Sequence, residues 1–258
     1  MSDIVTVQAV VLSAMAVGEY DKRLVLLTRE RGKITAFAKG ARRQGSPLMA
    51  ASNPFVFGSF TLYEGRSSYR INQASISHHF VELAASQPGV YYGFYFLELA
   101  DYFGQEGNDE RELMNLLYVT LRALLNPRLP DALIRCVFEL RILVIQGECP
   151  ELFQCVQCGE NRDKALPFFS AASHGMLCER CAREVRDAVR ISEAARYTLR
   201  FAAASPLERL YTFTVKEEVL GEITQLVESC MRYYMDKPPK SLGILEAMVR
   251  EKQETGFF

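Results

Sequence analysis

Histidine is scarce in this chain, and the familiar catalytic motifs are missing. The three histidines are His78, His79 and His174, and none lies in a His-Glu-x-x-His motif. A Gly-x-Ser-x-Gly motif is absent, and Gly32-Lys33 lacks the earlier glycine of a phosphate-binding loop. Few histidines severely limit general acid–base and serine–histidine schemes. A nuclease that uses paired carboxylates is not excluded, but no pattern places two carboxylates together.

Long apolar runs are missing too. The longest, from Val90 to Leu97, is soon followed by Glu98 and Asp101, so it is far shorter than the ~20 residues of a membrane span. The first 17 residues lack the basic region of a cleavable signal and carry Asp3. With 49% hydrophobic and 24% charged residues, the composition is that of a folded globular protein. We therefore expect a cytosolic protein without a membrane segment.

Acidic residues are absent from Arg31 to Tyr63. Residues 1–80 hold ten Lys or Arg and five Asp or Glu, for a net charge of +5, and the rest of the chain carries −6. A basic first segment on an acidic body indicates an anionic partner for that segment. Ordinary scatter of surface charge is the alternative explanation.

Five short apolar runs separated by turn residues occupy the first 80 residues. Their regular spacing favours a small closed barrel. Alternation within the third run places Lys33, Phe37 and Lys39 on one face, and Ile34 and Ala36 on the other. The five predicted strands are Ile4–Leu12, Arg23–Thr28, Lys33–Lys39, Phe55–Tyr63 and Tyr69–Ser77.

After residue 80 the apolar residues recur at helical spacing. Within the first of these segments, the aromatic residues between Tyr91 and Phe96 are expected to be core, and any exposed part of them would be a partner groove. Ser192 is a good N-cap for the helix that follows it. The predicted helices are Val81–Phe103, Glu110–Leu125, Asp131–Gln146, Ser192–Ala203, Lys216–Met235 and Ser241–Lys252.

Four cysteines form the most specific motif: Cys155 and Cys158, then Cys178 and Cys181 after a gap of 19 residues. Two such pairs are typical of a zinc site with four thiolate ligands. Four protein ligands leave no position for water, so the predicted site is structural. Four free cysteines or a redox pair are the alternatives, and His174 is an alternative ligand. Cys149 lies too far from the pairs, and Cys136 and Cys230 fall at buried helical positions.

The basic segment from Arg31 to Arg43 is the second motif. A strand with Lys33 and Lys39 on its outer face, running into a loop with Arg42 and Arg43, suits the phosphates of a nucleic acid. Aromatic rings offer stacking planes for unpaired bases, and the candidates are Phe37, Tyr63 and Tyr69. A solvated basic strand and loop is the alternative.

Several motifs in a fixed order resemble the RecO family of bacterial DNA-repair and recombination mediator proteins. They are Glu19–Thr28, Arg31–Lys33, Ala38–Arg43, Phe138–Arg141 and Gly147–Pro150, the last leading into Cys155. The similarity spans about residues 5 to 235. One departure is Cys149, where the family would have an aromatic residue, and it lies outside the four-cysteine set.

The resemblance implies an α+β multidomain chain: an OB-fold over 1–80, a helical domain over 81–148 and 183–258, and a zinc-binding module over 149–182. It also implies a cytoplasmic, nucleoid-associated protein, not an enzyme, that binds single- and double-stranded DNA and anneals complementary strands. Its partners would be RecR and the single-stranded-DNA-binding protein (SSB), and together they would load RecA onto coated strands. By match, the DNA contacts would be Lys33, Lys39, Arg42 and Arg43.

Two other functions stay open at this point. A zinc-stabilised adaptor could bind only proteins, through the aromatic segment Tyr91–Phe96. A metal-dependent nuclease could use scattered carboxylates, since the chain has 31 Asp and Glu residues. DNA retention at low salt and DNA cleavage with magnesium or manganese distinguish these functions from a mediator.

Overall fold

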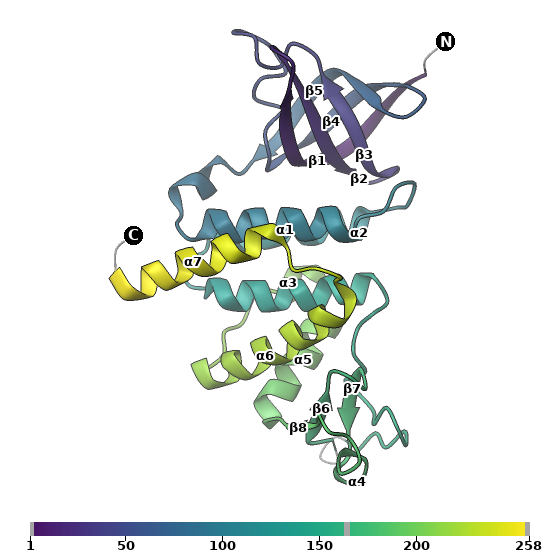
Figure 1. Cartoon of the computed structure of the whole chain (residues 1–258), viewed down its shortest axis with the longest axis vertical. Helices are drawn as coiled ribbons and strands as arrows, with labels where there is room; N and C mark the ends of the chain where they lie inside the picture. Colours follow the sequence, from purple (N-terminus) through teal and green to yellow (C-terminus); the bar gives the residue numbers. More distant parts are fainter. Residues whose placement is uncertain (1–2, 163–165, 256–258) are drawn as a thin grey trace. The chain divides into compact units, whose positions relative to one another are not determined.

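The computed structural model describes residues 3–162 and 166–255 (Figure 1). It contains two compact units. The first comprises Met1–Leu121 together with Pro239–Phe258, and the second comprises Arg122–Pro238. None of the described helices combines the length and the apolar character needed to cross a membrane.

A closed five-stranded barrel forms the N-terminal part of the first unit (Figure 1). The strand order is β1-β2-β3-β5-β4, and the ring closes where β1 pairs with β4. All pairings are antiparallel except the short parallel contact between β3 and β5. The predicted barrel is therefore confirmed. Its strands are β1 (Ile4–Val17), β2 (Asp21–Thr28), β3 (Gly32–Ala38), β4 (Val56–Glu64) and β5 (Tyr69–His79).

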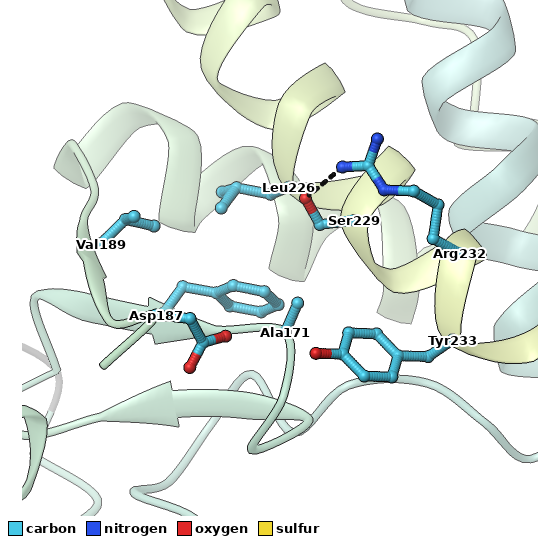
Figure 2. A pocket seen from close by; sticks show the side chains of 8 residues that line it. Ala171, Asp187, Val189, Leu226, Ser229, Arg232 and Tyr233 are labelled. Carbon is cyan, nitrogen blue, oxygen red and sulfur yellow. Dashed lines mark hydrogen bonds between the residues drawn. The ribbon is translucent and has the colours of Figure 1, made fainter. Parts of the chain in front are cut away.

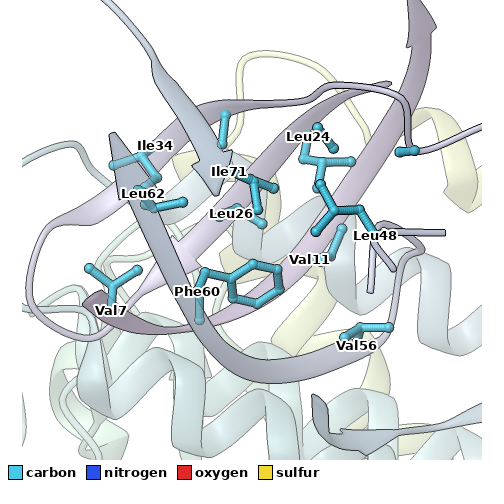
Figure 3. Packing of buried hydrophobic residues seen from close by; sticks show 14 residues of the cluster. Val7, Val11, Leu24, Leu26, Ile34, Leu48, Val56, Phe60, Leu62 and Ile71 are labelled. Carbon is cyan, nitrogen blue, oxygen red and sulfur yellow. The ribbon is translucent and has the colours of Figure 1, made fainter. Parts of the chain in front are cut away.

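Every second side chain of a strand points into the barrel and fills it, because successive residues of a strand point to opposite faces. In β3, Ile34, Ala36 and Ala38 are buried, whereas Lys33 and Phe37 are only partly so. Figure 3 shows the interior, where Phe60 and Leu62 of β4 lie among aliphatic side chains of the other strands. The labelled interior residues are Val7, Val11, Leu24, Leu26, Ile34, Leu48, Val56, Phe60, Leu62 and Ile71.

The first strand is longer than predicted, because its hairpin with β2 continues past the buried residues. Met15 pairs with Arg23, and the pairing runs on to Val17 and Asp21. These last positions of β1 are exposed, so apolar alternation could not reveal them. Gly18, with a φ of 58°, makes the turn into β2.

The predicted helix Val81–Phe103 is wrong in one respect, because it is broken before Gly89. A 3-10 helix over Val81–Ala85 is followed by α1 (Gly89–Phe103). Pro88 has no N–H to donate, and its ring clashes with the preceding turn of a helix, so it begins α1 instead of continuing the 3-10 helix. Most of the aromatic segment is core, as expected: Tyr92, Tyr95 and Phe96 are buried, whereas Phe94 is exposed.

Two more helices follow the predicted positions, α2 (Arg111–Leu124) and α7 (Lys240–Thr255). The C-terminal helix α7 packs against α1 and buries Leu245. The carboxylate of Glu98 in α1 caps the first turn of α7. It accepts hydrogen bonds from the backbone N–H groups of Lys240 and Ser241 at 2.8 Å each. Burial would raise the pKa of Glu98, but the bonds from Ser241 and Lys240 outweigh it and lower the pKa. The C-terminal helix thus belongs to the N-terminal unit.

The second unit is built on three helices: α3 (Asp131–Ile145), α5 (Glu193–Ala204) and α6 (Glu217–Tyr234). They contact one another pairwise. Arg135 of α3 joins two carboxylates, with Glu139 at 2.7 Å and Glu228 of α6 at 3.0 Å. Ser192 caps α5 as predicted, because its hydroxyl accepts a bond from the N–H of Ala195. A short 3-10 helix, Leu207–Arg209, follows α5.

We predict that the Phe60→Ala substitution lowers the free energy of unfolding by about 3–5 kcal/mol, since it leaves a cavity at the centre of the barrel. Urea unfolding followed by circular dichroism measures the change. Met15→Ala is the matched control, because Met15 is 61% exposed on β1 and its loss should cost less than about 0.5 kcal/mol. Equal losses in the two variants would contradict this assignment of the core.

Candidate metal centre and nucleic-acid interface

The four-cysteine motif lies in a small module of the second unit. Its sheet has the order β7-β6-β8, with β6 (Phe168–Ser170), β7 (Gly175–Leu177) and β8 (Val189–Arg190). The first cysteine pair lies in a tight turn, in which the N–H of Gly159 donates to the carbonyl of Cys155 at 2.9 Å. Gly159 has a φ of 72°, which a glycine adopts without strain. The second pair begins a short helix, α4 (Glu179–Ala182), with Cys178 as its N-cap.

The four sulfur atoms converge on one point. The Sγ atoms of Cys155, Cys158, Cys178 and Cys181 all lie within 4.8 Å of one another. Cys158 Sγ and Cys178 Sγ are 3.7 Å apart. That distance is close to the edge of about 3.8 Å of a tetrahedron whose zinc–sulfur bonds are about 2.3 Å. The donor set and its spacing therefore fit a tetrahedral metal ion with four thiolate ligands.

Backbone donors around the cluster favour ionised sulfur. Burial alone would raise the pKa of Cys155, but N–H groups of Cys178, Cys158 and Gln157 donate to its sulfur and lower the pKa to about 6. The guanidinium of Arg180 donates to the sulfurs of Cys181 and Cys158, and these contacts raise the pKa of Arg180. A thiolate is the form that binds a metal, so these donors favour Cys155 as a ligand, whereas its hydrogen bond with Cys178 raises the pKa of Cys181 to about 12.

The first cysteine turn is fastened to β7 by main-chain contacts. The N–H of Val156 donates to the carbonyl of Met176 at 3.0 Å, and Glu151 bridges to Gly175. Gly175 has no room for a side chain, because a Cβ atom there would lie 2.5 Å from the carbonyl oxygen of Glu151. Glycine is thus required at this position, and the strand that leads into Cys178 also positions Cys155.

The remaining candidates for a ligand lie outside the cluster. His174 Nδ1 is 2.9 Å from the hydroxyl of Tyr234 and is not grouped with the four sulfurs. Cys136 and Cys230 are buried, and burial raises the pKa of Cys230 to about 12. Cys149 is partly buried, which raises the pKa of its thiol to about 11.

A hollow beside the module is lined by residues of its sheet and of α6 (Figure 2). Figure 2 shows Arg232 directed to Ser229 on its own helix, at 3.1 Å. The carboxylate of Asp187 accepts bonds from the hydroxyl of Ser170 and the N–H of Ala172. The Arg232 bond thus lies within α6 and the Asp187 bonds lie within the module, while Phe169 and Leu226 are buried.

The four predicted DNA contacts lie on the barrel, but Lys33 differs from the others. Its ammonium donates to the carbonyl oxygen of Asp101 in α1 and lies 3.2 Å from the Asp101 carboxylate. The N–H of Lys33 also donates to the carbonyl of Gln105 at 2.8 Å. Its charge is therefore compensated within the first unit, which the sequence could not indicate.

Lys39, Arg42 and Arg43 lie together and exposed in the turns after β3. Arg42 spans to the β1–β2 turn, where its Nη1 donates to the carbonyls of Gly18 and Glu19 at 3.3 and 3.1 Å. Arg43 stacks over the ring of Tyr20, 4.8 Å from its centroid. These contacts join two turns that are distant in sequence. We call the exposed residues Lys39, Arg42 and Arg43 the basic turn surface.

Next to the basic turn surface, cations and aromatic rings alternate around the barrel. Arg23 of β2 pairs with Phe37 of β3, Phe37 with Arg70 of β5, and Arg70 with Tyr63 of β4. The Arg70 guanidinium lies 4.7 Å from the centroid of the Tyr63 ring. We call Arg23, Phe37, Arg70 and Tyr63 the cation–aromatic row. Phe37, Tyr63, Arg70 and Lys39 line one shallow hollow, to which Glu64 and Tyr69 also contribute.

Two members of this row, Arg23 and Arg70, were missed by sequence reasoning, because only the strand register makes them neighbours of Phe37. Tyr69, by contrast, does not offer a free stacking plane. Its ring packs against the barrel interior. Its hydroxyl accepts a bond from Arg31 at 3.2 Å and donates to Glu64 at 3.3 Å.

Two protein-family models together match nearly the whole chain. Residues 1–80 match the family model described as "Recombination protein O N terminal". Residues 89–243 match the one described as "Recombination protein O C terminal". The two models meet close to the end of the barrel.

Curated relatives named "DNA repair protein RecO" are similar over almost their full length. One from Desulforudis audaxviator is 34% identical over 93% of this chain and 96% of its own. One from Clostridium perfringens is 31% identical over 92% of this chain and 95% of its own. One from Acetivibrio thermocellus is 28% identical over 94% and 96%. With its two family models in order, its barrel and its four-cysteine cluster, this chain belongs to the RecO family of DNA repair and recombination proteins.

Proposed function

We propose that this protein is a recombination mediator that acts without a catalytic step of its own. It binds single- and double-stranded DNA, anneals complementary strands and, with RecR, helps to load RecA onto DNA coated with SSB. The observation that carries the DNA-binding part is the alternation of exposed cations and aromatic rings beside the basic turn surface. Membership of the RecO family supports the pathway and its partners.

The two surfaces divide the work of binding a strand. Lys39, Arg42 and Arg43 neutralise phosphates and release counterions, which gives affinity for any sequence. Phe37 and Tyr63 offer ring faces to unstacked bases, and every base has a π-face. Arg42 and Arg43 keep donors for phosphate, because a guanidinium has five N–H groups. Lys33, paired with Asp101, contributes least of the four predicted residues.

Annealing follows from such a surface. A protein that holds a strand by its phosphates and stacks its bases reversibly keeps the Watson–Crick edges free for a complementary strand. Screening of phosphate repulsion by the basic turn surface then lowers the barrier to pairing. No nucleotide hydrolysis is required for this.

We further propose the division of labour along the chain. Residues 1–80 form the OB-fold that binds DNA, residues 81–148 and 183–258 form a helical domain whose helices are shared between the two compact units, and residues 149–182 form the zinc module. Cys155, Cys158, Cys178 and Cys181 hold one structural zinc ion, since four thiolates leave no open position for a substrate. The protein works in the cytoplasm, at the nucleoid.

Annealing of two complementary labelled oligonucleotides, with and without SSB and without ATP, tests the proposed function. We expect acceleration that falls as salt rises, with a slope of log K against log salt of roughly −3 for about four phosphate contacts to a single strand. No acceleration by a fully metal-loaded protein, together with no retention on DNA at low salt, would point to a protein-only adaptor. DNA cleavage with magnesium or manganese would instead support a nuclease.

Replacing Lys39, Arg42 and Arg43 together with alanine should weaken binding to all DNA sequences alike and make the salt slope shallower by about two. Fluorescence anisotropy with oligonucleotides of different sequence, at several salt concentrations, measures both effects. Lys33→Ala is the informative comparison, because its ammonium is paired with Asp101. A larger loss from Lys33→Ala than from the triple variant would refute the assignment of the phosphate contacts.

Phe37→Ala should weaken binding of single-stranded DNA by about 1–3 kcal/mol, the contribution of stacking one base on an aromatic ring. Binding of a blunt duplex should change much less, because its bases are already stacked. Thr35→Ala is the matched control, two residues away on the same face of β3. Equal losses for both DNA forms would show that Phe37 acts only through the barrel.

Cys155→Ser or Cys178→Ser should lower thermal stability and solubility and release about one metal ion per chain, because a structural zinc contributes its binding free energy to folding. Atomic absorption and thermal unfolding measure the two effects. Cys149→Ser should keep its metal, since Cys149 lies outside the cluster. A metal-free variant of all four cysteines that melts like the parent protein would overturn the structural assignment.

A further inference from the structure

A cavity of about 380 Å³ lies in the first unit, where the barrel faces α2. It is distinct from the basic turn surface and shares no residue with the cation–aromatic row. Its wall combines strand residues, the residue that follows β2 and one side of α2. The lining residues used below are Gln8, Arg29, Phe57, His78, Asn115 and Tyr118.

Arg29 is fixed in this wall through its backbone. Its N–H donates to the carbonyl of Gln8 at 3.0 Å, and its carbonyl accepts from the N–H of Glu110 at 3.2 Å. The side chain is less well satisfied, because Arg29 Nε is buried without a hydrogen-bond partner. Among the residues that the structure describes, Arg29 forms no ion pair.

His78 also lines this cavity. Its Nε2 is buried and has no hydrogen-bond partner. The ring is held by its aromatic neighbours, with centroid distances of 4.2 Å to Phe80 and 5.8 Å to Tyr118. It therefore cannot turn to solvent without breaking this packing.

The positive charge of Arg29 in the cavity wall favours an anionic ligand. No Asp or Glu lines the cavity, so Arg29 lines it without a counter-charge. A guanidinium that lines a partly enclosed cavity costs free energy unless a ligand supplies an opposing charge. An oxyanion does so, because a guanidinium presents two parallel N–H groups that match phosphate geometry.

The other residues of the wall fit a ligand that is larger than an inorganic anion. Phe57 and Tyr118 supply an apolar side, with ring centroids 5.3 Å apart, and Gln8 and Asn115 supply amides that can both donate and accept. A volume of about 380 Å³ falls in the range of small-molecule sites. We propose that this cavity binds a nucleotide, with its phosphate on Arg29 and its base between the aromatic side and the amides. This goes beyond the proposed function and does not depend on it.

Calorimetric titration of the full chain tests the proposal, with deoxyadenosine monophosphate, inorganic phosphate and the uncharged nucleoside deoxyadenosine as probes. We expect the monophosphate to bind and the nucleoside to bind much more weakly. Arg29→Gln should weaken the monophosphate about tenfold or more, since charge-assisted hydrogen bonds are lost. Arg111→Gln is the control, because Arg111 lies on α2 outside the cavity and pairs with Asp109 at 3.6 Å.

The stability of the ligand-free variant separates a binding role from a structural one. Since Arg29 has no ion pair to lose, Arg29→Gln without ligand should melt no lower than the parent protein. Asn115→Phe, which fills the cavity from α2, is a second variant and should also abolish binding. No binding of monophosphate or phosphate at millimolar concentration, or equal binding by Arg29→Gln, would overturn the proposal.

The source of the nucleotide is decided with a short single-stranded oligonucleotide. If Arg29→Gln weakens the monophosphate alone, the cavity takes a free nucleotide. If it weakens both ligands, the cavity takes a nucleotide of a bound strand. The triple variant of the basic turn surface should keep monophosphate binding in either case, so failure of the DNA-binding proposal does not affect this result.

Discussion

The short parallel contact between β3 and β5 is the constraint on which the first unit depends. Only two residue pairs form it, Ala36 with Tyr69 and Phe37 with Arg70. Without it the five strands would be an open sheet with two free edges, which soluble proteins avoid. The same contact sets Phe37 beside Arg70 and so places the ring of one strand among the cations of its neighbours. The residue pairs that close the barrel are therefore also the ones that form part of the proposed DNA surface.

The second unit meets a different constraint, because its module has too little sheet to hold itself together. Its strands β6, β7 and β8 have three, three and two residues. Such strands bury little apolar surface, so a small module needs another source of stability. Four sulfur atoms within 4.8 Å of one another provide the geometry for one metal ion, which joins the turn at Cys155 to the helix at Cys178. Main-chain bonds from Val156 to β7 add to this link.

Much of this architecture could be predicted from local patterns. Alternation within strands gave the barrel, and the spacing of cysteines gave the cluster, because both depend on residues near one another in sequence. What could not be predicted depends on contacts between distant segments. No local sequence pattern indicates the ion pair of Lys33 with Asp101 or the pairing of Phe37 with Arg70. The break before α1 was predictable from Pro88, but the apolar period on both sides concealed it.

The cap that Glu98 forms on α7 has a consequence for the order in which the chain acquires its structure. Helix α1 precedes the second unit in the chain, but residues 240–255, which pack against it, follow that unit and are made after it. Until then the Glu98 carboxylate lacks the N–H groups of Lys240 and Ser241, and the site of Leu245 is empty. On the ribosome, the first unit therefore reaches its final packing only after the second unit has been synthesised. The first unit is thus completed by a helix that follows the whole second unit in the chain.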